Sequence, residues 1–304
     1  MKWLNVVVEE ESSLAEVEVL RVSPESSEYY PQQQQNKRIE EDDDDDWVPQ
    51  YRLLYFNLRG IVEGVRLLLA LAEIRYEDWR YPMRASGRGF GVDRAFLRDQ
   101  ENGIFKSNMN SLPILEIVEN DGGWQLGQSG AILRYLAAKH GKFGKTERDR
   151  AQIDAVLEHV REIQQKWYKA KRRPSTTQKQ MISSLGACVG YDNDDAERTV
   201  VSDKLTFLDD DLPKLLKTME NAVPTNPLPW LVGIDPSVAD VAVYHLLATP
   251  ETIITGNTAS FFDGDRDRVR AALARAPRLR ACVSAFSKLP TIQHWEANRP
   301  DTFA

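Results

Sequence analysis

The chain has 304 residues, the length of about two ordinary domains, and its hydrophobic content of 42% allows a sizeable core. Its formal net charge of -7 argues against a broad phosphate-binding surface, and so against nucleic acid as a partner. Cys188 and Cys282 lie far apart, and the scattered histidines show no metal-ligand spacing. No stretch approaches the roughly 20 apolar residues of a membrane helix. We therefore expect a cytoplasmic protein with no metal and no membrane insertion.

Residues 1–48 differ in composition from everything that follows. They contain the glutamine tract 32–35 and the aspartate run 42–46. Dense like charge and low hydrophobicity cannot offset the entropy lost on ordering, so the sequence predicts a disordered acidic tail. A tail that binds a partner remains the alternative.

Alternating secondary-structure signals begin at Tyr51. Residues 51–56 are rich in β-formers, and Gly60 opens a helix whose apolar positions repeat at helical spacing while Glu63, Arg66 and Glu73 fall on the other side. A second strand is predicted at residues 76–81. A strand, a helix and a strand in this order require a parallel crossover connection.

The rest of the first half completes a small α/β domain. The glycine- and arginine-rich residues 84–92 predict a mobile connection, followed by a short helix around residues 96–98. Two strands at 112–117 and 124–126 flank a glycine turn, and a helix starts at residues 128–129. The predicted order is βαβαββα over residues 49–143.

Strand signals disappear after residue 144. The apolar residues Ile153, Val156, Val160, Ile163 and Trp167 alternate in steps of three and four, which predicts a long amphipathic helix. Further helical patterns cover residues 203–220, 238–248, 269–274, 279–286 and the segment after Pro290. Ser237 and Asp240 have the spacing of a capping box. Residues 144–304 are thus expected to form an all-helical domain.

These motifs together resemble the glutathione transferases. Residues 51–60 (Tyr-Arg-Leu-Leu-Tyr-Phe-Asn-Leu-Arg-Gly) look like the first strand and helix of the sigma class, which includes prostaglandin D synthases and S-crystallins. Residues 112–115 and 128–136 look like the family's glutathione-binding signature, and residues 230–240 match its helix-capping motif. The resemblance implies a thioredoxin-like domain followed by a helical domain, with glutathione as co-substrate.

Tyr55 is the catalytic residue that the resemblance implies. A thiolate is the reactive form of glutathione, and a tyrosine hydroxyl at the end of the first strand can donate a hydrogen bond that favours it. This makes the chain a tyrosine-type transferase. Tyr51, on the same strand, is expected only to pack.

The resemblance also assigns the rest of the glutathione site. Pro113 resembles the family's cis-proline, which would present the Leu112 backbone to the cysteinyl part of glutathione. Gln128 and Ser129 begin a helix, where exposed amides suit the γ-glutamyl carboxylate, although Ser129 also suits simple helix capping.

Other contacts are expected at the two ends of glutathione. Glu162 from a partner subunit would meet the glutamyl ammonium, with a solvated helix face as an equal alternative. Phe96, Arg98 and Lys106 are the candidates for the glycine carboxylate. Ile61 stands where sigma members often carry an arginine near the thiol, so thiol activation would rest mainly on Tyr55.

The resemblance predicts conjugation of glutathione to hydrophobic electrophiles by a homodimer, with Arg134 near the subunit contact. Tyr168 and Trp167 are candidates for the substrate pocket, although Trp167 fits the buried face of its helix better. A glutathione-dependent isomerase of the prostaglandin D synthase kind is the first alternative. A non-catalytic protein like the S-crystallins is the second. The electrophile itself is not encoded in any motif of the sequence.

Overall fold

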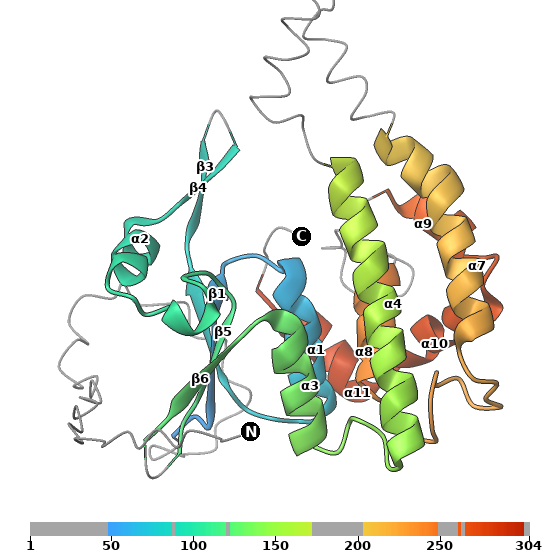
Figure 1. Cartoon of the computed structure of the whole chain (residues 1–304), viewed down its shortest axis with the longest axis horizontal. Coiled ribbons are helices and arrows are strands. Elements are labelled where there is room, and N and C mark those ends of the chain that lie inside the picture. The colour runs from blue at the N-terminus through green and yellow to red at the C-terminus, as the bar shows by residue number, and fades with distance from the viewer. Residues whose placement is uncertain are drawn as a thin grey trace, which may run out of the picture. The chain divides into compact units, whose positions relative to one another are not determined.

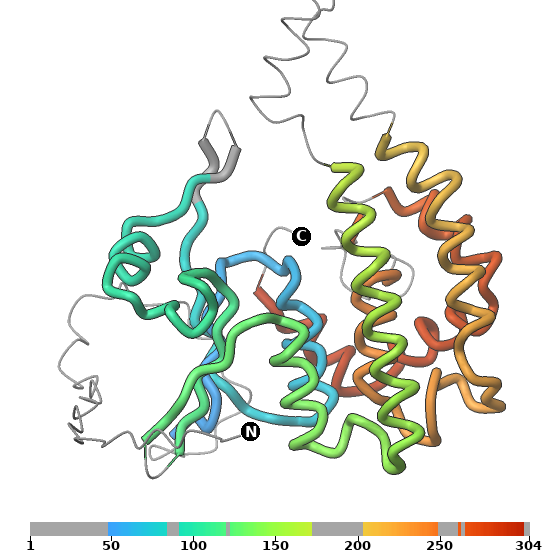
Figure 2. Tube along the Cα trace, viewed as in Figure 1, coloured from blue at the N-terminus to red at the C-terminus, as the bar shows by residue number. Residues whose placement is uncertain are grey.

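The computed structural model describes residues 48–86, 89–119, 122–171, 203–248, 261–262 and 265–300, which are coloured in Figure 1, and Figure 2 draws the same view as a tube along the Cα trace. The acidic tail predicted for residues 1–48 lies outside these residues, except for its last position. The predicted division of the chain at residues 143 and 144 remains a prediction.

A four-stranded mixed sheet organises the first half of the described chain (Figure 1). Its strands stand in the order β2-β1-β5-β6, with bounds Glu77–Tyr81, Tyr51–Phe56, Ile114–Ile117 and Trp124–Gly127. β1 runs parallel to β2 and antiparallel to β5, and β5 runs antiparallel to β6. The predicted thioredoxin-like arrangement is confirmed, including the parallel crossover between the first two strands.

Helices and turns connect these strands as the sequence predicted, with one addition. The 3-10 turn η2 (Gly60–Val62) leads into α1 (Glu63–Leu71), α2 covers Arg94–Glu101, η3 covers Lys106–Asn108 and α3 covers Ser129–Lys139. The addition is an antiparallel hairpin of β3 (Met83–Ser86) and β4 (Gly89–Val92). Its glycines, weak strand formers, had indicated an irregular connection.

Helix α1 is buried on nearly every side, which contradicts the polar face expected for it. Glu63 is 4% exposed and Arg66 is completely buried, whereas Glu73, just beyond the helix, is exposed. α1 contacts α3, α8 and α11, so the face opposite the sheet is covered as well. Glu63 and Arg66 are tolerated there because they pair with each other at 3.4 Å and with further charges.

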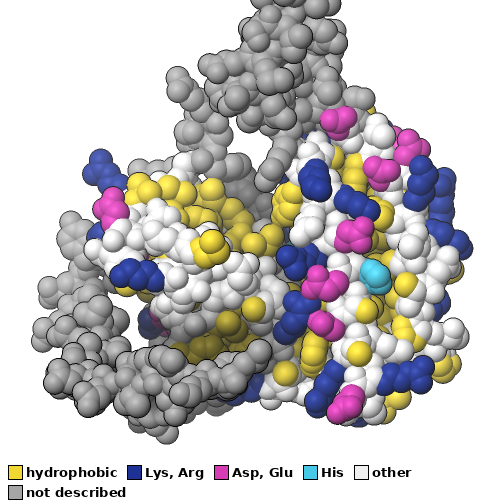
Figure 3. Space-filling view, viewed as in Figure 1, with side chains coloured by type: hydrophobic (Ala, Val, Ile, Leu, Met, Phe, Trp, Pro, Cys, Tyr) yellow, Lys and Arg dark blue, Asp and Glu magenta, His cyan; other side chains and the backbone are white. Residues whose placement is uncertain are grey.

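The second half of the described chain is helical, as predicted. It contains α4 (Glu147–Lys171), the π-helical turn η4 (Phe207–Asp211), α7 (Leu212–Ala222), α8 (Val238–Leu247), α9 (Arg266–Leu273), α10 (Pro277–Phe286) and α11 (Pro290–Asn298). Trp167 is 1% exposed on α4 and belongs to the core. In Figure 3, acidic and basic side chains are interspersed over the face of α4 turned to the viewer.

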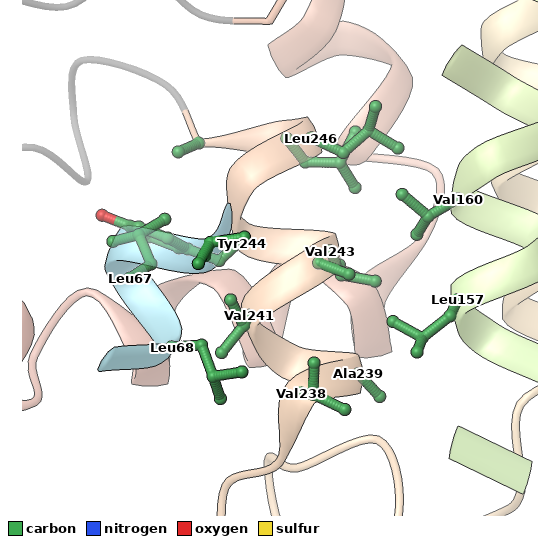
Figure 4. Packing of buried hydrophobic residues seen from close by; sticks show 14 of the residues in the cluster. Leu67, Leu68, Leu157, Val160, Val238, Ala239, Val241, Val243, Tyr244 and Leu246 are labelled. Atoms are coloured by element: carbon green, nitrogen blue, oxygen red, sulfur yellow. The ribbon is translucent and has the colours of Figure 1, made fainter. Parts of the chain in front are cut away.

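Helix α8 is the central element of this half. Figure 4 shows Val241 of α8 on the side of Leu68 of α1, and Val243 on the side of Leu157 of α4. Contacts with α1, α4 and α10 surround α8, so most of its side chains are buried. Such a helix is apolar all round because it has no solvent-facing stripe.

The capping box predicted at the start of α8 is confirmed and extends further. Asp240 accepts hydrogen bonds from the Ser237 amide at 2.8 Å and from the Leu231 amide at 2.8 Å. The buried thiol of Cys282 on α10 lies 3.3 Å from the same carboxylate. Asp240 therefore joins the loop before α8, the helix start and α10.

Among the helices of the described residues, none combines the length and the apolar character needed to cross a membrane.

Candidate functional site

The strand register brings the main predicted site residues to one end of the sheet. Leu54 of β1 pairs with Ile114 of β5, and Ile114 pairs with Gly127 of β6. Continued by one position, this register puts Tyr55 of β1 opposite Pro113, just before β5, and Pro113 opposite Gln128, just after β6. Adjacent strands lie about 4.8 Å apart, so residues that span 73 positions of the sequence, from Tyr55 to Gln128, come close together.

Tyr55 is the second-last residue of β1 and is 9% exposed. Its hydroxyl makes a hydrogen bond with the Ile61 backbone and lies 2.9 Å from the position that a Cβ on Gly60 would occupy. Burial raises the pKa of Tyr55, and the Arg66 charge and the Ile61 hydrogen bond offset only part of that rise. The hydroxyl is thus held in its protonated, hydrogen-bond-donating form at neutral pH.

Arg66 holds the turn that carries Gly60 and Ile61. The Arg66 guanidinium donates to the Leu58 carbonyl oxygen at 2.8 Å and to the Asp78 carboxylate at 3.1 and 3.3 Å. Asp78 lies on β2, so the arginine ties the second strand to the backbone just after Tyr55. Gly60 has a φ of +46°, a conformation that a side chain would strain.

The Leu112–Pro113 peptide bond is cis, as predicted from the motif. Asn108, which the sequence did not single out, connects this segment to the next. Its side-chain amide donates to the Pro113 carbonyl at 2.9 Å, and its carbonyl oxygen accepts from Gln128 Nε2 at 2.8 Å. Gly127 leaves room for it, because a Cβ there would lie 2.4 Å from Asn108 Cβ.

Helix α3 begins directly after Gln128, which has a φ of +69° and is its N-cap residue. Ser129 is the first helical residue and not the cap, so its alternative role as a simple capping residue is wrong. No side chain caps this helix start. Its first amides are therefore open to an outside acceptor, as the positive end of a helix dipole favours.

The three candidates for the glycine carboxylate have different surroundings. Phe96 packs in an aromatic cluster with ring centroids 4.9 Å from Phe56 and 5.4 Å from Phe105, which leaves only 7% of it exposed. Arg98 is largely exposed and pairs with Asp99 at 2.9 Å. Lys106 is exposed, with its chain lying against Gly103. Only Arg98 and Lys106 offer a cation at the surface.

Glu162 and Arg134 belong to a charged surface on α3 and α4. Glu162 is exposed and pairs with Lys166 at 2.7 Å, and this partner lowers its pKa. Arg134 binds Asp154 at 2.5 Å and also pairs with Glu158 of α4. Their predicted roles toward a second subunit stay predictions.

His245 of α8 reaches the same turn from the opposite side. Its imidazole is hydrogen-bonded to the Gly60 backbone. On the outer side its ring packs edge-to-face on Phe261 at 5.8 Å, and Phe261 also contacts Tyr168 of α4 at 5.7 Å. Tyr168 is 41% exposed.

The described part of the chain contains no group of three or more His, Cys, Asp or Glu side chains that could hold a metal ion.

Comparisons with known proteins agree with this arrangement. The family model described as "Glutathione S-transferase, C-terminal domain" matches residues 181–299. Glutathione S-transferase 1 of Ascaris suum is 27% identical over 84% of this chain and 99% of its own length. The crystal structure of the Ascaris lumbricoides glutathione S-transferase covers 84% of this chain with a TM-score of 0.53 and 27% identity. The chain belongs to the glutathione transferase family.

A further relative indicates to which part of the family the chain is related. The Hematopoietic prostaglandin D synthase of Rattus norvegicus is 25% identical over 84% of this chain and 99% of its own length. The protein is a sigma-like member, related to the prostaglandin D synthases.

Proposed function

We propose that the protein is a tyrosine-type glutathione transferase in which Tyr55 stabilises the glutathione thiolate. The observation that carries this proposal is the position of Tyr55 next to the cis Leu112–Pro113 bond and the start of α3 after Gln128, at one end of the sheet. The Tyr55 hydroxyl is bonded to the Ile61 backbone, and like any tyrosine with a pKa of 10 or above it keeps its proton at neutral pH. The O–H group is then available to donate to a sulfur anion, which lowers the pKa of the thiol.

The neighbours of Tyr55 support a bound glutathione. The Leu112 backbone beside the cis-proline would pair with the cysteinyl unit, and Gln128 with the uncapped start of α3 at Ser129 would hold the γ-glutamyl carboxylate. Arg98 or Lys106, with Phe96 nearby, would hold the glycine carboxylate. Glu162 of a second copy of the chain would meet the glutamyl ammonium, in the homodimer that we expect in the cytoplasm.

The proposed reaction joins glutathione to a hydrophobic electrophile. With a chlorodinitrobenzene the thiolate forms a carbon–sulfur bond, the carbon–chlorine bond breaks and chloride leaves, while the thiol proton passes to solvent. The aromatic residues Tyr168 and Phe261 supply an apolar surface for such a substrate.

Isomerisation of an endoperoxide is the second candidate, because the chain is related to a prostaglandin D synthase over nearly the whole of that protein. It would use the same thiolate and return it unchanged. A non-catalytic role like that of the S-crystallins is the third. It is opposed by the presence of Tyr55, Pro113 and Gln128 at one end of the sheet.

Turnover of a chlorodinitrobenzene by the wild type, Tyr55→Phe and Tyr51→Phe tests the proposal. Tyr51 is a matched control, since it lies on the same strand and its hydroxyl bonds to His140 at 3.0 Å instead. We expect Tyr55→Phe to lose about 100-fold in rate and Tyr51→Phe to keep it. Equal rates for Tyr55→Phe and the wild type would refute the role of Tyr55. Glutathione binding without turnover would favour the isomerase, and an assay with an endoperoxide would decide it.

A further inference from the structure

His245 occupies an unusual position for a histidine on an apolar helix. It lies where α8 packs against α1, half-buried, and it hydrogen bonds to the Gly60 backbone. Gly64 makes this approach possible: a Cβ on Gly64 would stand 3.3 Å from His245 Nδ1, closer than such contacts ordinarily are. A glycine inside a helix costs about 1 kcal/mol relative to alanine, and here it admits the imidazole.

The Gly60 backbone is one residue away from the group that holds Tyr55. Ile61, the next residue, bonds to the Tyr55 hydroxyl through its backbone. Gly60 itself lies so close that a Cβ on it would be 2.9 Å from that oxygen. A displacement of the Gly60–Ile61 turn would therefore move the hydrogen-bond partner of the catalytic hydroxyl.

The surroundings of His245 favour a neutral, donating imidazole. Burial lowers its pKa, and so does the charge of Arg299, while Glu63 of α1 and the Gly60 hydrogen bond act in the opposite direction. Phe261 covers the ring edge-to-face at 5.8 Å. A neutral imidazole has one N–H, and the Gly60 carbonyl is a suitable acceptor for it.

We propose that His245 is a positioning residue for Tyr55, acting from α8 through the Gly60–Ile61 turn. Its effect on glutathione rests on the function proposed above, whereas its effect on the Tyr55 hydroxyl does not. The turn then has two supports, with Arg66 holding Leu58 on one side and His245 holding Gly60 on the other. α8 thereby takes part in setting the geometry of a residue on β1.

Four variants separate positioning from plain stability. His245→Leu removes the donor, and His245→Asn keeps an amide donor at the δ position. Gly64→Ala leaves the histidine in place but pushes against Nδ1, and it strengthens the helix intrinsically, so loss of folding is not expected to mask its effect. Val241→Ala is the control, since it removes core volume from α8 on the side of Leu68 of α1 without touching Gly60.

The first measurement follows Tyr55 itself, without glutathione. Carbon-13 at Cζ of tyrosine reports the ionisation of each phenol, and the Tyr55 signal is the one missing in Tyr55→Phe. We expect its pKa to rise further in His245→Leu and Gly64→Ala, because a displaced Ile61 amide no longer stabilises the phenolate. His245→Asn and Val241→Ala should match the wild type.

The second measurement follows the thiolate absorbance of bound glutathione against pH. We expect His245→Leu to raise the thiol pKa by about one unit. At pH values below the wild-type thiol pKa, the variant would then hold about tenfold less thiolate than the wild type. His245→Asn should restore it, with the KM for glutathione nearly unchanged in both variants.

An unchanged Tyr55 signal in His245→Leu would overturn the proposal, and so would an equal shift in Val241→Ala. If the wild type bound glutathione without forming a thiolate, the proposed function would fail, and the Tyr55 signal would still decide the role of His245.

Discussion

Trp295 Nε1 donates a hydrogen bond to Glu63 Oε1 across 3.1 Å, although the two residues are 232 positions apart in the sequence. The same carboxylate oxygen lies 3.0 Å from Arg299 Nη1, and the other oxygen lies 3.4 Å from Arg66 Nη1. One buried carboxylate therefore joins α1, next to the candidate site, to α11 at the end of the described chain.

Replacing Glu63 by Gln should destabilise the protein strongly. The amide keeps the size of the side chain but removes one negatively charged partner from both Arg299 and Arg66, in a buried site. Breaking a buried ion pair in this way costs about 3 kcal/mol or more. Urea denaturation measures the loss, and Glu101→Gln, on the exposed end of α2, is the control, expected within about 0.5 kcal/mol of the wild type. Equal midpoints for both variants would contradict this prediction.

The same carboxylate predicts an acid-sensitive stability. Burial raises the pKa of Glu63, but Arg66, Arg299 and the Trp295 hydrogen bond together lower it from 4.5 to about 2. A lowered folded-state pKa stabilises the fold above pH 4.5, and that contribution disappears as the pH falls toward 2. The difference corresponds to about 3 kcal/mol.

The measurement is the free energy of unfolding between pH 6 and the acid limit of folding, in wild type and Glu63→Gln. Other carboxylates titrate in both proteins, so the difference between the two curves isolates Glu63. We expect that difference to shrink as the pH falls below about 4.5. A difference that does not change with pH would show that Glu63 has the same pKa in the folded and unfolded states, which would contradict the prediction.

Gly60→Ala should impair activity beyond its effect on folding. The new methyl group would meet Leu58 Cδ1 at 2.6 Å and the Tyr55 hydroxyl at 2.9 Å, on a backbone with a φ of +46°. Gly141→Ala is a matched control, because its φ is +69° and nothing lies within 4 Å of its Cβ position. Both variants should lose about 1 kcal/mol through backbone strain. Conjugation assays at a temperature where both are folded should show a loss only in Gly60→Ala.

Asn108→Leu should weaken glutathione binding. Without the amide, Gln128 loses its hydrogen bond and the Pro113 carbonyl loses its donor, so two segments of the site are no longer held together. We expect about a tenfold higher Kd for glutathione by calorimetry, with kcat affected less. Ser107→Ala, which removes an exposed hydrogen bond to Gln125 from the same turn, should leave the Kd unchanged.

Local pattern was enough to predict most of the fold. The β-formers at residues 51–56 match β1 to the residue, and the three-and-four spacing up to Trp167 matches α4. The β3–β4 hairpin was missed because glycine favours turns and carries no strand signal. The burial of Glu63 and Arg66 was missed for another reason. A charge in sequence looks solvated, and the partners that allow its burial come from β2 and the last helix.

The candidate site divides in the same way. Tyr55, Pro113, Gln128 and Ser129 belong to contiguous motifs, so the resemblance identified them. Asn108 contacts Gln128, 20 positions away in sequence, and His245 contacts Gly60, 185 positions away, and no spacing rule connects such residues. The sequence marks these two residues only indirectly, through glycines. Gly127 has no side chain where Asn108 lies, and Gly64 has none where His245 lies.

The carboxylate of Asp240 has a consequence for how the molecule opens. Because it binds the Leu231 amide, the Ser237 amide and the Cys282 thiol together, the loop, α8 and α10 cannot separate one at a time without stranding a buried charge. The amides of α8 should then exchange their hydrogens with solvent only when the whole helical layer opens, more slowly than those of the exposed surface of α4. The helix that supports Tyr55 from behind would be among the last parts of the protein to come apart.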